Sequence, residues 1–206
     1  MRLAVIGATG RTGREIVSRA LALGHDVSAL ARPGVALSTP PSRGSLVVVR
    51  GDIDDGGALR ATLDKTDAVV MAIAQGLRLG SADLCRRGAA SLLEVLEPES
   101  RLVAVSSYGA AETADATGYA RMVRVAKPAV MRDKDAMEAL IRASGTDWTI
   151  VRPARLNDSP GMGRYRVGAD VRANLRSSIP RSDLAAYLVD ATVSHRDSRA
   201  AVTITR

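Results

Sequence analysis

The most distinctive chemical pattern of the chain is GATGRTG at residues 7–13, which directly follows the apolar run RLAVI. Helical periodicity begins at about Thr12, so the pattern lies between a predicted strand and a predicted helix. Unpaired backbone N–H groups at a helix N-terminus bind anions, and missing side chains let a diphosphate come close. Gly7, Gly10 and Gly13 therefore predict a dinucleotide-binding loop. The alternative is a strand-to-helix turn that binds nothing.

A second candidate is Arg32, which ends the apolar run DVSALAR. Asp or Glu normally holds this position when the adenosine ribose carries a free 2′-hydroxyl. An arginine suits a 2′-phosphate, because its planar, permanently charged guanidinium pairs well with phosphate oxygens. Arg11 and Arg14 could reach the same side, so the pattern favours NADP(H) over NAD(H). The alternative is that Arg32 is a solvated residue before Pro33 in an arginine-rich chain.

Two further segments end predicted strands. Asp52 follows the run SLVVVRG, where its carboxylate could accept from an adenine amino group or could cap the next turn. The segment AIAQG, residues 72–76, ends the run DAVVM. Ligands of parallel sheets bind at the carboxyl ends of strands, and small residues there let the middle of a dinucleotide lie flat.

Composition limits the classes of partner. The 206 residues suffice for one domain, the formal charge is +7, and aromatic residues make up only 2%. The arginines are scattered and stacking platforms are scarce, which disfavours nucleic acid and favours a small anionic ligand. No apolar run approaches the ~18 residues of a membrane span, and the N-terminus has no signal-peptide pattern. We therefore expect a cytoplasmic protein with no membrane partner, either a monomer or a homodimer.

Cysteine and histidine usage excludes two kinds of site. Cys85 is the single cysteine, so there is no internal disulfide, and its place in a predicted helix indicates a small buried hydrophobe. His25 and His195 lie far apart in the sequence, and neither belongs to a pair with metal-ligand spacing. We expect no metal site.

Strand-like and helical segments alternate along the chain. Near-continuous apolar strands separated by helices predict an α/β fold, a Rossmann-type doubly wound parallel sheet in a single domain over residues 1–206. We expect the strand order 3-2-1-4-5-6. The predicted strands cover residues 2–7, 26–32, 45–52, 67–74, 101–107, 147–153 and 200–206. The predicted helices cover about 12–23, 82–97, 133–143 and 181–193.

Two segments lack clear periodicity and are expected to form the walls of a substrate site. Residues 108–131 are irregular or weakly helical, and the Gly- and Arg-rich residues 154–178 are typical of a loop. The side chains expected to line the substrate are Tyr108, Tyr119, Met131, Met162 and Tyr165. Trp148 lies inside a predicted strand and is expected in the core.

At this point the sequence resembles a known family. The segments GATGRTG, ALARP, VVVRGDIDD, DAVVMAIA, VAVSS, ALIRASGTDWTIVRP and IPRSDLAAYL occur in the order seen in atypical short-chain dehydrogenase/reductases. The similarity is greatest to the small NAD(P)H-binding, NmrA-like branch that includes biliverdin-IXβ reductase/flavin reductase, and it covers nearly the whole chain. The resemblance implies a Rossmann domain that binds NADP(H), with the substrate stacked on the nicotinamide.

The resemblance also implies roles for individual residues. The diphosphate would be lined by Gly7, Thr9, Gly10, Arg11, Thr12 and Gly13. Arg32 would hold the 2′-phosphate, and Asp52 and Ile53 would flank adenine. The ribose would pass Ala72, Ile73 and Ala74. The nicotinamide end would be bordered by Ser106, Ser107, Pro153, Ala154 and Arg155, and Lys134 falls where relatives often place a lysine or histidine near the reacting ring.

The chain departs from the wider superfamily in one respect. The proton-transfer pair Tyr-x-x-x-Lys is absent, because Glu112 stands four residues after Tyr108 and Val123 stands four residues after Tyr119. Alcohol, ketone and epimerase chemistry are therefore not expected. Reduction of a flavin needs no such tyrosine, since the hydride goes to an electron-poor ring and water supplies the proton.

Three residues are the candidates for meeting negative charge on an acceptor, namely Ser107, Lys134 and Arg155. Lys134 lies in the acidic stretch MRDKDAME, so the alternative is a salt bridge on a helix surface. Ser106 and Ser107 end a strand, where hydroxyls also cap turns. We expect an NADP(H)-dependent oxidoreductase that reduces a small flavin, quinone or enone. The alternatives are a non-catalytic NADP(H)-sensing protein and a step of a secondary-metabolite pathway.

Overall fold

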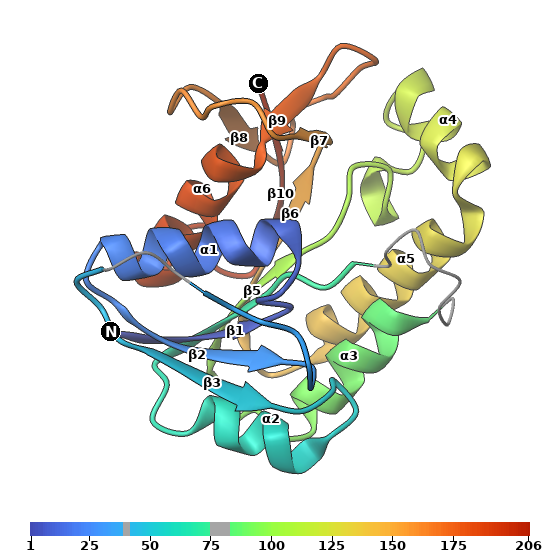
Figure 1. The fold of residues 1–206 in the computed structure, drawn as a ribbon. Helices are drawn as coiled ribbons and strands as arrows, with labels where there is room; N and C mark the ends of the chain where they lie inside the picture. Colours follow the sequence, from blue (N-terminus) through green and yellow to red (C-terminus); the bar gives the residue numbers. More distant parts are fainter. Residues whose placement is uncertain (39–41, 75–82) are drawn as a thin grey trace.

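A computed structural model describes residues 1–38, 42–74 and 83–206, and a mostly parallel sheet runs through the centre of these residues (Figure 1). Its strand order is β3-β2-β1-β4-β5-β6-β10-β8. The strands are β1 (Arg2–Ile6), β2 (Asp26–Ala31), β3 (Leu46–Arg50), β4 (Ala68–Met71), β5 (Arg101–Val105), β6 (Asp147–Pro153), β8 (Arg166–Gly168) and β10 (Ala200–Thr205). The order from β3 to β6 is the predicted one, which confirms the doubly wound Rossmann-type fold.

Burial explains why these segments form parallel strands. Every residue of β4 and β5 is buried, and so is every residue of β1 and β2 except the first. Near-continuous apolar runs of this kind belong to sheets covered on both faces. Parallel pairing sets Ile6 of β1 beside Leu30 of β2 and Met71 of β4. The segments that follow these strands therefore meet along one edge of the sheet.

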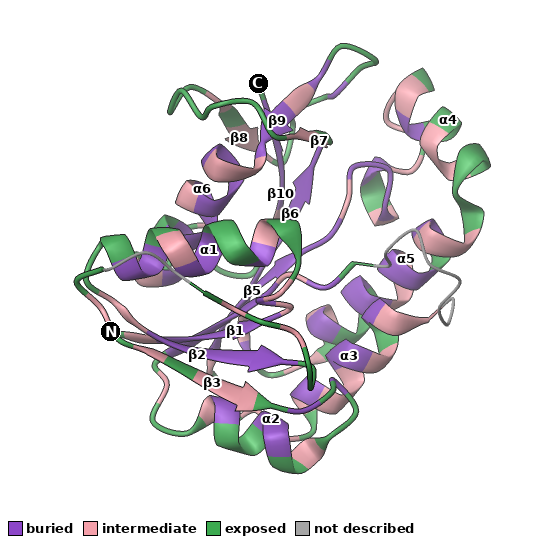
Figure 2. Cartoon of the chain, in the orientation of Figure 1, coloured by how far each residue is buried: buried purple, intermediate pink, exposed green. Residues whose placement is uncertain are grey.

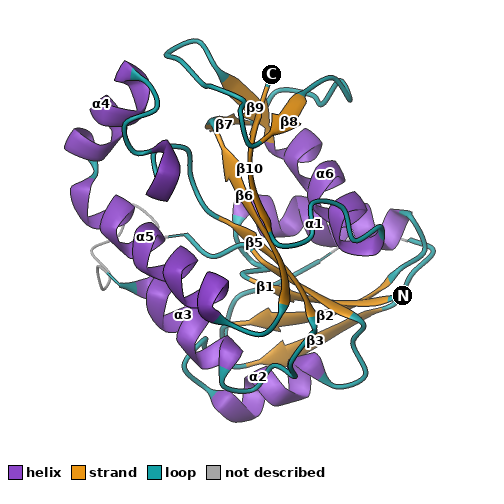
Figure 3. Cartoon of the chain, turned by 180° about the vertical axis from the view of Figure 1, so that it is seen from behind, coloured by secondary structure: helices purple, strands orange, loops and turns teal. Residues whose placement is uncertain are grey.

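Helices cover both faces of the sheet (Figure 3). They are α1 (Arg11–Ala22), α2 (Gly56–Leu63), α3 (Leu84–Leu93), α4 (Gly118–Ala126), α5 (Pro128–Ala143) and α6 (Arg181–Val193). α1 packs against α6 on one face, and α3 packs against α5 on the other. The first hydrophobic core cluster lies on the α1 and α6 face and includes Ile16 and Leu188. The second lies on the α3 and α5 face and includes Met137 and Ile141. Trp148 is 8% exposed within the second cluster, which confirms its predicted place in the core.

The helices differ from the prediction on the α5 side of the sheet. α2 was not predicted, and it begins after Asp55, whose side chain accepts from the backbone N–H of Ala58 at 3.0 Å. α4 is a regular helix where irregular or weakly helical chain was expected, and Ala120 is its one buried residue. α5 begins at Pro128, five residues before the predicted start. Figure 2 shows how exposed α4 is compared with the strands.

The segment 154–178 is also more regular than predicted. β7 (Arg155–Asn157) pairs in parallel with β9 (Ser178–Pro180) as a separate two-stranded sheet, while β8 pairs antiparallel with β10 at the edge of the main sheet. These strands are only three residues long, and β7 and β8 are partly exposed, so they carry little hydrophobic pattern. None of the helices in the described part of the chain is long and apolar enough to cross a bilayer.

Candidate functional site at the carboxyl edge of the sheet

The glycine loop forms a tight cradle between β1 and α1. Gly7 has a φ of +87°, and a Cβ there would lie 2.5 Å from the carbonyl oxygen of Ala72. A Cβ on Gly13 would collide with the carbonyl oxygen of Gly7. The backbone N–H of Gly10 donates to that same carbonyl at 3.0 Å. Side chains at Gly7 and Gly13 are thus excluded by backbone atoms, so the tight strand-to-helix turn requires glycine at both positions.

The N-terminus of α1 lacks the groups that usually satisfy a helix start. Its N-cap, Gly10, has no side chain, and the first turn contains no acidic residue. By contrast, Asp55 caps α2 and Thr117 caps α4 through side-chain oxygens. The unpaired N–H groups and the positive end of the helix dipole therefore face the cradle. This arrangement fits the diphosphate of a dinucleotide, which supplies the missing acceptors.

Arginines surround the adenosine end of the cradle. Arg32 is exposed just after β2, and its guanidinium forms no hydrogen bond or ion pair with the described residues. Arg14 donates to the carbonyls of Thr9 at 3.2 Å and Ala36 at 2.8 Å, so it braces the loop after β2 instead of pointing freely to a phosphate. Arg11 forms an ion pair with Asp158.

Arg50 is a residue that sequence reasoning missed at this end. It ends β3, pairs in register with Ala31, and donates through Nη1 to the carbonyl of Val35 at 2.6 Å. A guanidinium thus holds the loop that carries Arg32. The signal was available, because Arg50 ends the apolar run VVVR just before Gly51-Asp52.

The predicted adenine and ribose positions lie along the same edge. Asp52 is exposed, and its Oδ1 accepts from the backbone N–H of Ile53 at 2.7 Å, so the turn-capping role is present. The Ile53 side chain is buried in the core. Ala72 is half-buried and its N–H donates to Ile6 O at 2.8 Å, and Ala74 is exposed. Residues 75 and 76 of the segment AIAQG lie outside the described residues, as do residues 39–41 of the loop before β3.

Lys134 is neither exposed nor part of a surface salt bridge. The alternative that it forms a salt bridge on a helix surface is therefore wrong. Its side chain is buried, and Nζ donates to the carbonyls of Ile73 and Val105, each at 2.9 Å. These carbonyls belong to the carboxyl ends of two neighbouring strands. Lys134 therefore ties the ends of β4 and β5 together, directly beneath the edge where ligands bind in such sheets.

The two serines after β5 point to different partners. Ser106 is buried and its hydroxyl donates to Glu138 Oε1 at 2.5 Å, toward α5. Ser107 is half-buried, and its hydroxyl makes a longer contact of 3.3 Å with the carbonyl of Tyr108. The hydroxyl of Ser107 is thus held by a longer hydrogen bond than that of Ser106.

The nicotinamide end is completed by the chain after β6. The Pro153 carbonyl accepts from the N–H of Tyr108 at 3.0 Å, and Ala154 is buried with its N–H donating to Ile204 O at 3.0 Å. Arg155 is exposed. The structure therefore brings the predicted residues of β5, β6 and their loops to one place.

Comparisons with known proteins agree with this geometry. A family described as NAD(P)H-binding matches residues 7–194. The chain belongs to this family. An uncharacterised relative from Bacillus subtilis, YwnB, is 25% identical over 202 residues, which cover 92% of this chain and 91% of YwnB.

Solved structures of low sequence identity share the fold. The oxidoreductase ylbE from Lactococcus lactis has a TM-score of 0.81 at 17% identity, covering 99% of this chain and 90% of that chain. ChuY, an anaerobillin reductase from Escherichia coli O157:H7, has a TM-score of 0.77 at 19% identity, covering 99% and 96%. The family match confirms the NAD(P)H-binding part of the predicted resemblance, and the solved structures confirm the fold.

In this NAD(P)H-binding chain the predicted substrate side chains separate into two groups. Tyr108 and Tyr119 are stacked with ring centroids 6.0 Å apart, and Met131 is buried near Gly109. Tyr165 instead meets the edge of the Tyr187 ring of α6 at 6.2 Å. Tyr165 therefore packs against the core cluster of α1 and α6, whereas Tyr108 and Tyr119 belong to another cluster, and its place in the substrate wall stays a prediction.

Titration of the neighbouring groups follows from their surroundings. Burial raises the pKa of Tyr119, although the Arg155 charge opposes this shift. Burial also raises the pKa of the Cys85 thiol, against the nearby Lys134 charge. Cys85 is fully buried, so its predicted role as a small hydrophobe is confirmed.

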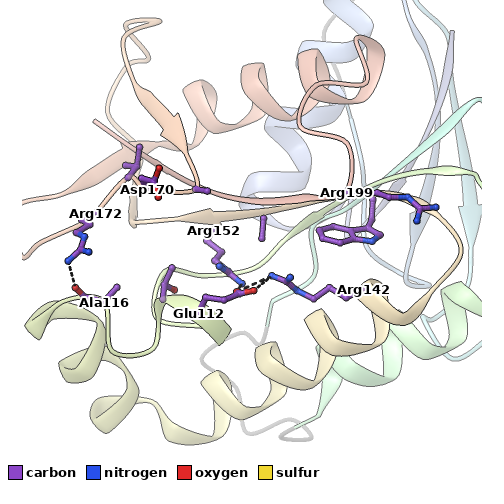
Figure 4. Close-up of a pocket in the computed structure, with 12 residues that line it drawn as sticks. Glu112, Ala116, Arg142, Arg152, Asp170, Arg172 and Arg199 are labelled. Carbon is purple, nitrogen blue, oxygen red and sulfur yellow. Dashed lines mark hydrogen bonds and ion pairs between the residues drawn. The ribbon is translucent and has the colours of Figure 1, made fainter.

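Sequence reasoning also missed a buried ion-pair network behind Ser106. Arg152 donates to Glu138 through Nε at 3.0 Å and Nη2 at 2.5 Å, and it also contacts the carboxylate of Glu112. Arg142 reaches the same Glu112 at 2.7 Å. Figure 4 shows Arg152, Arg142 and Glu112 meeting between the sheet and α5. These three residues line a hollow of about 350 Å³. The network links Ser106 to this solvent-facing hollow.

Proposed function

We propose that the protein is an NADPH-dependent reductase of small conjugated or redox-active acceptors, such as flavins, quinones or enones. The observation that carries the proposal is the uncapped glycine cradle at the start of α1, with an exposed Arg32 after β2 whose guanidinium has no partner among the described residues. When bound, the nicotinamide supplies a hydride. The family match supports a nicotinamide cofactor, and Arg32 is the reason to prefer the phosphorylated form.

The chain's own residues bind the cofactor and orient the acceptor. The N–H groups of the cradle hold the diphosphate, and Arg32, on a loop braced by Arg14 and Arg50, pairs with the 2′-phosphate. Tyr119, half-buried and stacked on the buried ring of Tyr108, forms one wall for a flat acceptor. Ser107 and Arg155 are placed to meet negative charge that develops on the acceptor.

The absent Tyr-x-x-x-Lys pair supports acceptors that need no protein proton donor. Lys134 and Ser106 are bonded to protein groups, so neither is free to transfer a proton to a substrate oxygen. A hydride delivered to an electron-poor conjugated ring leaves an anion that water can protonate. Simple alcohols and ketones are therefore poor substrates under this proposal.

The absence of the Tyr-x-x-x-Lys pair also favours a second candidate, a non-catalytic NADP(H)-sensing protein. In such a protein the cradle and Arg32 bind NADPH and NADP⁺, and the loops near the nicotinamide meet a protein partner. The missing proton donor and the internal bonds of Lys134 and Ser106 support this candidate as well.

One experiment separates the two candidates. Purified protein is incubated with NADPH and with a panel of flavins, quinones and enones, and the nicotinamide absorbance is followed. The reductase proposal expects acceptor-dependent loss of NADPH with at least one class. Calorimetric binding of NADPH with no turnover of any acceptor contradicts the reductase and supports the sensor. Binding of neither nucleotide contradicts both candidates.

A further inference from the structure

Lys134 is a buried cation that no carboxylate neutralises by direct contact. Its side chain is 4% exposed, and two of its N–H groups donate to the carbonyls of Ile73 and Val105. Nζ also lies 4.0 Å from the Sδ atom of Met137, and the Lys134 charge is close enough to the Cys85 thiol to oppose the rise of its pKa by burial. No ion pair joins Lys134 to an acidic residue in the described part of the chain.

Two buried carboxylates nearby are held by partners of their own, one by backbone N–H groups and the other by an arginine. The carboxylate of Asp133 accepts from the backbone N–H groups of Cys85 at 2.9 Å and Arg86 at 2.8 Å, at the positive end of α3. Glu138 is paired with Arg152. Asp133 offsets part of the Lys134 charge, but both of its carboxylate oxygens accept hydrogen bonds from the backbone of α3. The ammonium of Lys134 lies against the strand ends themselves.

The position of this charge matters because of what borders it. Val105 directly precedes Ser106 and Ser107, and Ile73 lies between the two alanines that follow β4. These are the segments along which the ribose and the nicotinamide of the proposed cofactor would lie. The oxidised nicotinamide ring carries a positive charge, whereas the reduced ring is neutral. A fixed cation beneath this edge repels the oxidised form only.

We propose that Lys134 makes the site selective for reduced over oxidised cofactor, acting as an electrostatic positioning residue and not as a proton donor. The inference rests on the proposed function, since it concerns the same dinucleotide site. Two unit charges about 10 Å apart at an effective dielectric of about 20 interact strongly enough to change an equilibrium constant roughly tenfold. The consequence is preferential loading of NADPH and rapid release of NADP⁺.

The test compares the affinities of NADPH and NADP⁺ by calorimetry in four proteins. These are the wild type, Lys134→Gln, Lys134→Arg and the control Lys127→Gln. Lys127 is exposed just before α5, so its variant makes the same chemical change away from the strand ends. Gln keeps a donor for the two carbonyls but loses the charge, and Arg keeps the charge.

The wild type and the Lys127→Gln control should bind NADPH about tenfold more tightly than NADP⁺. In Lys134→Gln the ratio of the two dissociation constants should fall toward one, mainly because NADP⁺ binds more tightly, and Lys134→Arg should keep the ratio high. Structural damage alone would weaken both nucleotides together and leave their ratio unchanged, which overturns the inference.

A measurement on the wild type alone keeps the inference testable if the variants do not fold. Equal affinities of wild-type protein for NADPH and NADP⁺ overturn it while leaving the proposed function standing. Failure to bind either nucleotide instead overturns the proposed function. The two failures are therefore distinguishable in a single titration series.

Discussion

At the scale of single residues, the site depends on a few positions where a backbone atom or a charge decides what fits. Gly7 and Gly13 leave no room for a Cβ, so the cradle is a steric requirement of the strand-to-helix turn. Arg32 is different, because nothing in the described fold uses its guanidinium. A cation that the fold does not need is the natural candidate for a ligand contact.

Arg32→Asp is expected to weaken NADPH binding by about 10- to 100-fold, the range of a lost charge-assisted hydrogen bond. NADH lacks the 2′-phosphate, so its affinity should change little or rise. Calorimetric titration of both nucleotides checks this. Arg43→Asp is the matched control, because Arg43 is exposed before β3, at the opposite edge of the sheet. Equal losses for NADPH and NADH would remove Arg32 from the 2′-phosphate site.

The contacts of the site residues explain why the places of some could be predicted from the sequence and those of others could not. The glycine spacing and Arg32 are local patterns, so their places at the strand ends were predictable. The Ser106–Glu138–Arg152 network joins three elements far apart in the sequence, and no spacing rule connects them. The ambiguity over Lys134 had the same origin, since its ammonium bonds to the carbonyls of Ile73 and Val105, which the local sequence does not reveal.

At the scale of elements, the chain's regular core was predictable and its substrate side was not. β4 and β5 are buried throughout, and this is the pattern that a parallel sheet imposes on a sequence. α4 buries only Ala120, so the helix contributes almost nothing to the core that the buried strands define. Its start is defined instead by Thr117, whose Oγ1 accepts from Ala120 N at 3.2 Å and donates to Ala173 O at 3.0 Å.

Thr117→Ala is expected to reduce the free energy of unfolding by about 1 kcal/mol through the lost N-cap. It also removes the 3.4 Å contact with the Tyr108 hydroxyl, so the stacked tyrosine wall should loosen. The KM for the best acceptor of the panel should rise severalfold, with NADPH affinity unchanged. Steady-state kinetics and urea unfolding measure the two effects.

Asp55→Ala provides the matched control for the α4 prediction. It removes the N-cap of α2, at a similar cost in stability, but α2 lies on the far side of α3 from the tyrosines. Its KM for the acceptor should equal that of the wild type. A rise in KM with both variants would show that general loss of stability, and not the tyrosine wall, controls acceptor binding.

At the scale of the whole molecule, the two edges of the sheet have separate tasks. The carboxyl edge carries the cradle, Lys134 and the serines, whereas the amino edge carries groups that only hold the strands together. Asp147, at the start of β6, accepts from Arg101 of β5 at 3.2 Å, from His195 at 2.8 Å and from the hydroxyl of Ser198. This cluster ties β5 and β6 to the loop before β10.

The Asp147 cluster should set part of the acid limit of stability. Burial raises the pKa of Asp147, but hydrogen bonds from Ser198 and His195 and the charge of Arg101 outweigh burial and hold the pKa below its ordinary value. The unfolded chain therefore takes up this proton at a higher pH than the folded protein does. The stabilisation is present above about pH 4 and is lost as the pH falls through the folded pKa.

Asp147→Asn is expected to lower the free energy of unfolding at neutral pH by about 1 to 3 kcal/mol, because it weakens bonds to charged partners. The difference between variant and wild type should shrink as the pH falls below about 4, since the wild type then loses the same charge. Urea unfolding over a pH series measures this convergence.

Because Asp147 lies at the amino edge, NADPH affinity at neutral pH should remain that of the wild type. A parallel loss of NADPH affinity would show that the two edges are coupled, against the division of tasks that the sheet topology indicates.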